Sequence, residues 1–157
     1  MNSPHENAPL ALHVSAGTPT ADPRLGLTVT HRRYVPYAHA HYGGALVDGA
    51  YTLGLFGDVA TEVAIVMDGD EGLLAGYSAV SFLGPVRAGD VLEATCEVVR
   101  IGRRSRELRC TARVVARAEP ERSPSAAQVL DPALVVVEAT ATLVVPAPDA
   151  AVTIQSQ

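Results

Sequence analysis

The chain has 157 residues, of which 48% are hydrophobic and 18% are charged, as expected for one globular domain rather than a disordered chain. Its net charge of −5 argues against a nucleic-acid surface, because phosphate binding needs clustered cations. No apolar run reaches the roughly 18 residues of a membrane span, and Met1–Asn7 shows no secretory signal. We therefore expect a cytoplasmic protein that binds neither nucleic acid nor membrane.

The first part of the chain predicts an arm and then a strand. Residues 1–22 carry several prolines and no sustained periodicity, so we expect a loose N-terminal arm. Over 24–34, Leu25, Leu27 and Val29 alternate with Gly and Thr, which predicts a first strand.

A loop rich in His and Tyr follows, and it contains the H-x-H pair His39 and His41. Such a pair can bind a metal, but no third Cys, His or acid lies at ligand spacing, so we expect no metal site. We interpret His39 as a loop residue bonded to backbone. His41 directly precedes two glycines, which favours a functional role there.

Residues 44–67 predict one long helix. Apolar and mostly small residues recur at three- and four-residue spacing, and small residues let a helix lie close to a curved sheet. A second, partly polar sector suits an interface or a cleft. The first set is Leu46, Ala50, Leu53, Gly57, Ala60, Ala64 and Met67, and the second is Asp48, Tyr51, Leu55, Asp58 and Glu62.

The rest of the chain predicts strands, over 73–83, 91–101, 105–117 and 133–145, with a loop insertion over 119–132 and a tail over 147–157. Polar and apolar residues alternate cleanly in the third of these strands, which is typical of antiparallel sheet. Cys96 and Cys110 fall on the inward phase and are expected to be buried reduced thiols. A single apolar helix among strands must be wrapped by a sheet. The prediction is therefore one α+β domain over 23–146 with the hotdog fold, an antiparallel sheet around a long central helix.

From Tyr42 to about Arg113 the chain also resembles one hotdog family, the β-aminoacyl-CoA ammonia lyases. The resemblance is carried by "HYGGALVDGA", "LFGDVATE", "DGDEGLLAGYSAVSFLGPVRAGD" and "GRRSRELRCTARVV". It implies reversible removal of ammonia from a β-aminoacyl-CoA to give the enoyl-CoA. It also implies that no metal or organic cofactor is needed beyond the coenzyme A of the substrate.

The expected site is the start of the helix. Unpaired N–H groups and the positive end of the helix dipole lie there, and Gly43 and Gly44, next to Tyr42, let a ligand approach the backbone. A thioester carbonyl polarised at this point needs a nearby base to take the α-proton, and Asp48 and His41 are the candidates. The alternative for Asp48 is that it only accepts first-turn N–H groups.

The position of the acid separates two hotdog classes. In several thioesterase groups a catalytic acid follows a glycine pair by seven residues, which here is Tyr51, whereas the carboxylate is Asp48. This spacing departs from the thioesterases and fits the lyases. The lyases often carry a basic residue where this chain has Tyr51, which leaves the acyl group of the substrate open.

Further candidates are charged. Arg87, Arg103 and Arg104 are expected to bind the phosphates of coenzyme A, the alternative being a solvated charge cluster. Asp58 and Glu62 lie about 15 Å and about 21 Å along the helix from Asp48, too far to share its site in one subunit. We favour buried or interfacial carboxylates paired with Arg, and keep both as a possible second acid.

Two other functions remain open from the sequence: a hotdog acyl-CoA or acyl-carrier-protein thioesterase, and a non-catalytic acyl-thioester binder. The thioester carrier is either coenzyme A or an acyl carrier protein. An isolated hotdog subunit leaves a sheet edge and one side of the helix unburied, so we expect a homodimer with a continuous sheet and further assembly.

Overall fold

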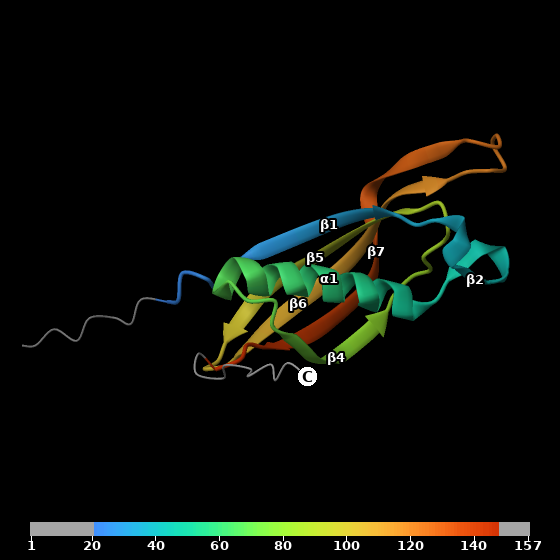
Figure 1. Cartoon of the computed structure of the whole chain (residues 1–157). Coiled ribbons are helices and arrows are strands. Elements are labelled where there is room, and N and C mark those ends of the chain that lie inside the picture. The colour runs from blue at the N-terminus through green and yellow to red at the C-terminus, as the bar shows by residue number, and fades with distance from the viewer. Residues whose placement is uncertain (1–20, 148–157) are drawn as a thin grey trace, which may run out of the picture.

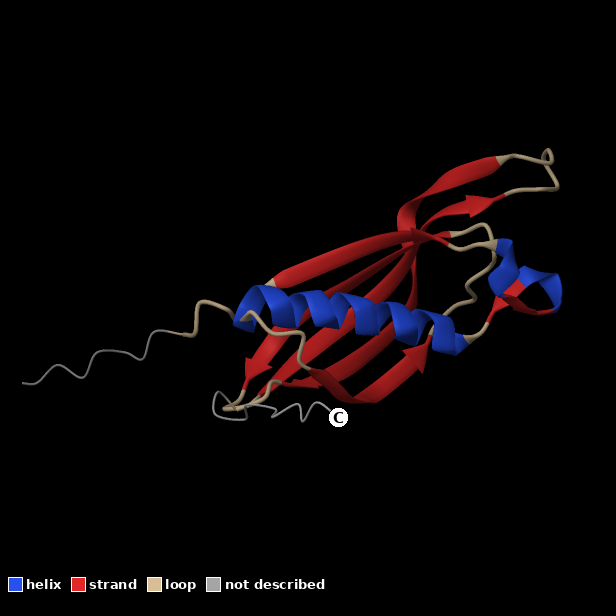
Figure 2. Ribbon diagram, in the orientation of Figure 1, coloured by secondary structure: helices blue, strands red, loops and turns tan. Residues whose placement is uncertain are grey.

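The computed structural model describes residues 21–147, so nearly all of the predicted N-terminal arm and C-terminal tail lies outside the described residues. One long helix lies across one face of an antiparallel sheet (Figures 1 and 2). The helix is α1 (Gly49–Asp68), and the five-stranded sheet has the order β1-β5-β6-β7-β4. Its strands are β1 (Thr28–Tyr34), β4 (Leu73–Phe82), β5 (Val91–Ile101), β6 (Ser105–Ala118) and β7 (Ala127–Val144).

A second, two-stranded ribbon precedes the helix. It consists of β2 (Ala40–Tyr42) and β3 (Leu46–Val47), with the 3-10 turns η1 (Tyr37–His39) and η2 (Gly43–Ala45). The predicted architecture, one helix wrapped by antiparallel sheet, is confirmed.

The core lies between the inner side of α1 and the inward phase of the strands. The helix has the length and mean hydropathy of a membrane span, 20 residues and 1.4, but it is packed on the sheet. Its buried residues are Thr52, Leu55, Phe56, Val59, Ala60, Val63 and Ala64. Cys96 and Cys110 lie directly opposite each other in β5 and β6 and are buried free thiols, as predicted.

The helix begins at Gly49, five residues later than the periodicity predicted. Gly44 has φ +70° and Ala45 has φ +60°, and left-handed residues cannot continue a right-handed helix. Leu46 and Val47 pair with β2 instead. The helix ends as predicted to within a residue, at the left-handed C-cap Gly69.

Two strand boundaries also differ from the prediction. The first strand begins at Thr28, after the left-handed Gly26 at φ +82°. β7 begins at Ala127, so the last part of the expected loop over 119–132 is strand. Ala127–Val129 pair with the end of β6, and this hairpin projects beyond the sheet (Figure 1). Residues 130–133 fall in a register shift, which is where a strand tolerates Pro132.

Candidate active site

Asp48 is the N-cap of α1. Its backbone is extended, at φ −72° and ψ 161°, and Oδ1 accepts a hydrogen bond from the Tyr51 backbone N–H at 3.0 Å. Oδ2 makes no hydrogen bond within the described residues, and the side chain is 38% exposed. One oxygen therefore stabilises the first helical turn, while the other is free to exchange a proton.

The β2–β3 ribbon brings His41 to the start of the helix. The turn between β2 and β3 contains a left-handed residue, Gly44, which adopts this conformation without steric cost. His41 Nδ1 lies 3.9 Å from Asp48 Oδ2, and the ring contacts Tyr42 edge-on with centroids 4.5 Å apart. A gap of 3.9 Å is about 1 Å longer than a hydrogen bond. The structure thus brings together the two groups that the sequence named as base candidates, although their catalytic roles remain predictions.

A cleft of about 320 Å³ opens beside Asp48. Asp48 supplies the one charged side chain in its lining, and most of the other side chains are apolar. The lining consists of Tyr42, Val47, Asp48, Gly49, Thr52, Phe82, Gly84, Pro85, Val86 and Val137. Because the first N–H groups of an α-helix have no intrahelical acceptor, those at Gly49 and Ala50 are the ones beside the carboxylate. The N–H groups of Gly43 and Gly44 belong to the preceding turn. The unpaired N–H groups of the helix therefore begin at Gly49, five residues later than the expected start at Gly44.

Tyr51 is not part of the cleft lining. Its ring packs against His39, with centroids 4.8 Å apart, and against the core. Its hydroxyl is buried and has no hydrogen-bond partner within residues 21–147. The structure therefore separates Tyr51 from Tyr42, which does line the cleft.

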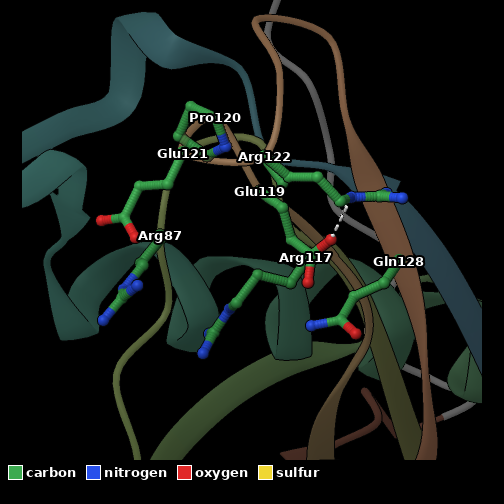
Figure 3. A pocket seen from close by; sticks show the side chains of 8 residues that line it. Arg87, Arg117, Glu119, Pro120, Glu121, Arg122 and Gln128 are labelled. Carbon is green, nitrogen blue, oxygen red and sulfur yellow. Dashed lines mark ion pairs between the residues drawn. The ribbon is translucent and has the colours of Figure 1, made fainter.

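Arg87 lies on the other side of the segment that leads to the helix. It forms an isolated bridge with Leu46, and its side chain is exposed in a hollow of about 400 Å³ beneath the β6–β7 hairpin. Figure 3 shows Arg87, Arg117 and Gln128 around this hollow, with Arg122 bonded to Glu119 at its edge. Arg87 makes no ion pair within the described residues, so its guanidinium is available to a phosphate.

A buried ion pair that the sequence did not reveal holds this region. Asp90 is fully buried and accepts Arg117 Nε at 2.9 Å and Nη2 at 2.8 Å, and this partner raises the pKa of Arg117. Asp90 also accepts the Arg87 backbone N–H at 2.8 Å. The pair therefore fixes the turn that carries Arg87. The sequence shows Asp90 in a turn and Arg117 on a polar strand face, but not that they meet.

The two distal carboxylates face β1. Asp58 pairs with Arg33 at 3.1 Å and Glu62 pairs with His31 at 2.5 Å, and both carboxylates are about half exposed. The expected partner, an arginine, is found for Asp58, whereas the partner of Glu62 is a histidine, and neither carboxylate is buried in the subunit. Neither carboxylate lines the Asp48 cleft, in agreement with the helix-rise argument.

Arg103 and Arg104 lie in the β5–β6 turn, at the far end of the subunit. Arg104 donates to the Val145 carbonyl at 3.3 Å, and the adjacent Arg106 binds Asp68, the last residue of α1, at 2.7 Å. One subunit alone therefore does not bring these arginines to Asp48. Within residues 21–147, no group of three or more His, Cys, Asp or Glu side chains is placed to bind a metal.

Comparison with known proteins agrees with this geometry. Residues 45–121 match the Thioesterase superfamily. A 3-aminobutyryl-CoA ammonia lyase of Acetoanaerobium sticklandii is 49% identical over 107 residues, which is 68% of this chain and 85% of that protein.

Solved structures give the same fold. The β-alanyl-CoA:ammonia lyase from Clostridium propionicum is 31% identical with a TM-score of 0.73, covering 77% of this chain and 86% of that one. A hexameric hotdog fold thioesterase of Campylobacter jejuni is 17% identical with a TM-score of 0.62, covering 76% of this chain and 83% of its own, and supports the fold alone. The chain therefore belongs to the β-aminoacyl-CoA ammonia lyase family of hotdog-fold proteins.

Proposed function

We propose that this protein is a carbon–nitrogen lyase that reversibly eliminates ammonia from a β-aminoacyl-CoA. The observation that carries the proposal is that Asp48, at the N-terminus of α1, lines an otherwise apolar cleft and that its Oδ2 makes no hydrogen bond within the described residues. The relatives named for this activity on 3-aminobutyryl-CoA and β-alanyl-CoA support it.

The chemistry follows from the position of these groups. Asp48 takes a proton from the carbon next to the thioester carbonyl, and the electron pair forms an enolate. The electron pair of the enolate then forms the carbon–carbon double bond, the bond from the β-carbon to nitrogen breaks, and the substrate's β-ammonium group leaves as neutral ammonia. The ammonia takes from Asp48 the proton that came from the α-carbon and becomes ammonium. In the reverse direction ammonia adds to the β-carbon and the α-carbon is protonated.

The start of α1 supplies the electrophile for this step. The N–H groups of Gly49 and Ala50 and the helix dipole stabilise negative charge on the thioester oxygen, and they do so most when the enolate forms. His41 Nδ1 lies 3.9 Å from Asp48 Oδ2, so a side-chain movement of about 1 Å would bring it within hydrogen-bond distance, where it can exchange a proton with Asp48 or bind the departing ammonia. This mechanism uses only side chains and backbone, so we propose that no cofactor is needed beyond the coenzyme A of the substrate.

Assembly follows from β4, an edge strand whose apolar side chains are exposed. Leu73, Phe82 and the following Leu83 are 71%, 58% and 57% exposed. An open apolar edge of this length favours pairing with a second copy, so we propose a homodimer with a continuous sheet, and further assembly as in the hexameric thioesterases of this fold.

Such pairing also gives the distant arginines a role. Antiparallel pairing of two β4 strands places the Leu73 end of one beside the Phe82 end of the other. The β5–β6 turn lies at the Leu73 end, because Leu73 pairs with Val144 and Val144 with Ser105. We propose that the Arg103–Arg104 turn of the partner subunit and Arg87 together bind the phosphates of coenzyme A, or of an acyl carrier protein, in the cytoplasm.

The test separates a lyase from a thioesterase. Purified protein given crotonyl-CoA and ammonia should form 3-aminobutyryl-CoA, detected by mass spectrometry, without releasing thiol to a trapping reagent. Rapid thiol release from a saturated acyl-CoA, with no amine adduct, would instead show a thioesterase. Binding without either product would show an acyl-thioester carrier. Asp48→Asn is the control that ties the adduct to this site.

A further inference from the structure

The wall of the Asp48 cleft includes a large aromatic side chain at the end of an edge strand, Phe82. Phe82 ends β4 and lines the cleft, yet it is 58% exposed and lies outside the hydrophobic core. We infer that Phe82 determines the length of the acyl chain that the cleft accepts. This inference rests on the proposed function, because it assigns the cleft to the acyl group.

The Phe82 ring lies directly against the backbone of the first helical turn. A Cβ placed on Gly49 would lie 2.5 Å from Phe82 Cε1 and 2.6 Å from Cζ. Only a glycine at this position lets the ring approach so closely. The ring therefore lies against Gly49, the residue after Asp48, and forms the wall of the cleft beside the proposed reacting carbons.

The surroundings of the ring are apolar. Phe82 pairs with Val137 of β7, which is 2% exposed, and both line the cleft with Val47 and Val86. With the thioester oxygen at the helix N–H groups and the α-carbon at Asp48, the acyl carbons beyond the β-carbon extend along these side chains. A ring in this position shortens the space left for the acyl chain, and a mismatch of one methylene in an apolar pocket typically costs about 10-fold or more in selection.

The experiment compares the binding of butyryl-CoA and octanoyl-CoA by isothermal titration calorimetry. The wild-type protein should bind butyryl-CoA at least about 10-fold more tightly than octanoyl-CoA, and Phe82→Ala should reduce this ratio about 10-fold by opening the wall. Phe82→Leu should shift the ratio in the same direction by less. Leu83→Ala is the matched control, because Leu83 is equally exposed and adjacent but does not line the cleft, and it should leave the ratio unchanged.

Sedimentation of each variant reports whether assembly is preserved. If Phe82→Ala causes the assembly to dissociate, the Phe82→Trp variant tests the inference instead. Its larger ring preserves the apolar edge of β4 and should strengthen the preference for butyryl-CoA over octanoyl-CoA. An unchanged ratio in the Phe82 variants, or an equal shift in Leu83→Ala, would overturn the inference. A saturated thioester has no double bond to which ammonia can add, so a lyase binds it without turnover, and a thiol-trapping reagent in a parallel sample detects any hydrolysis. Selection by chain length without ammonia addition to crotonyl-CoA would contradict the proposed reaction and not the role of Phe82.

Discussion

The two ends of α1 carry the same residue type in opposite environments. Asp48 at the start is 38% exposed, and one of its oxygens has no hydrogen-bond partner within the described residues. Asp68 at the end is 11% exposed, and Arg106 contacts both of its oxygens, Nη2 at 2.7 Å and Nε at 3.0 Å. Arg24 adds a third bond at 3.1 Å.

The difference shows what each carboxylate can do. A carboxylate at the C-terminus of a helix is opposed by the helix dipole, and at Asp68 two guanidinium groups offset this, which leaves a structural charge pair with no free oxygen. At Asp48 the dipole itself stabilises the charge, so no cation is needed and one oxygen remains available for chemistry. A reactive acid is thus distinguished from a structural one by its unused hydrogen-bonding capacity.

The largest effect on activity is expected from a substitution of Asp48, at the start of α1. Asp48→Asn retains an oxygen that accepts the Tyr51 N–H and removes the titrating group, so the rate of ammonia addition to crotonyl-CoA should fall about 10²–10⁴-fold. Thermal unfolding should change little, because Asn is as good an N-cap as Asp. Unchanged turnover in a destabilised variant would instead show that Asp48 is only a cap, and the chemistry would then move to His41.

The reverse result, lost stability with retained turnover, is expected from a substitution of Asp68 at the end of α1. Asp68→Asn leaves the guanidinium of Arg106, which is 7% exposed, without its charge partner, and should lower the free energy of unfolding by about 3 kcal/mol. Urea unfolding measures this, and turnover of the folded variant should remain close to wild type. A stable protein with lost activity would mean that the C-terminal end of the helix takes part in the reaction.

Acid titration sharpens the contrast further. The hydrogen bond from Arg24 lowers the pKa of Asp22, beside the Arg24–Asp68 pair, from 3.8 to about 2. A folded pKa below the unfolded value means that the contribution to stability is complete above pH 3.8 and is lost as the pH falls through about 2. NMR titration of the Asp22 carboxyl should give that midpoint, and Arg24→Gln should return it toward 3.8.

The smallest effect is expected at Glu62, between the two ends. Its pair with His31 is exposed, and exposed pairs contribute about 0–1 kcal/mol, so Glu62→Gln should leave turnover within about twofold and stability within that range. Steady-state kinetics and thermal melts measure both. Abolished activity would show that the active site is built across subunits and includes this carboxylate.

Much of this architecture was predictable from local patterns. The strand predicted over 91–101 matches β5, alternation in 105–117 predicted most of β6, and the long apolar period predicted α1 up to its C-cap. The glycine pair next to His41, with Asp48 a few residues on, indicated the region where the structure brings His41 and Asp48 together beside a cleft. These signals are local, because each depends on residues close together in the chain.

The errors arose where strand pairing overrides the local pattern of the sequence. Leu46 continues the helical period of the sequence, but its pairing with β2 removes it from the helix. Residues 127–132 have the composition of a loop, but pairing of Ala127–Val129 with the end of β6 makes that part strand.

The amino-acid sequence by itself determined the fold class and the family and placed Asp48 within the first turns of the helix, because periodicity and motif spacing are properties of neighbouring residues. The left-handed residues Gly44 and Ala45, seen only in the structure, move the helix start to Gly49 and make Asp48 its N-cap. Only the tertiary structure decided which carboxylates are paired, that Asp90 and Arg117 meet across 27 residues, and that Arg103 and Arg104 lie at the far end from Asp48. Ion pairing and burial depend on strand register and on the direction of each strand, and these are settled only when the whole sheet closes over the helix.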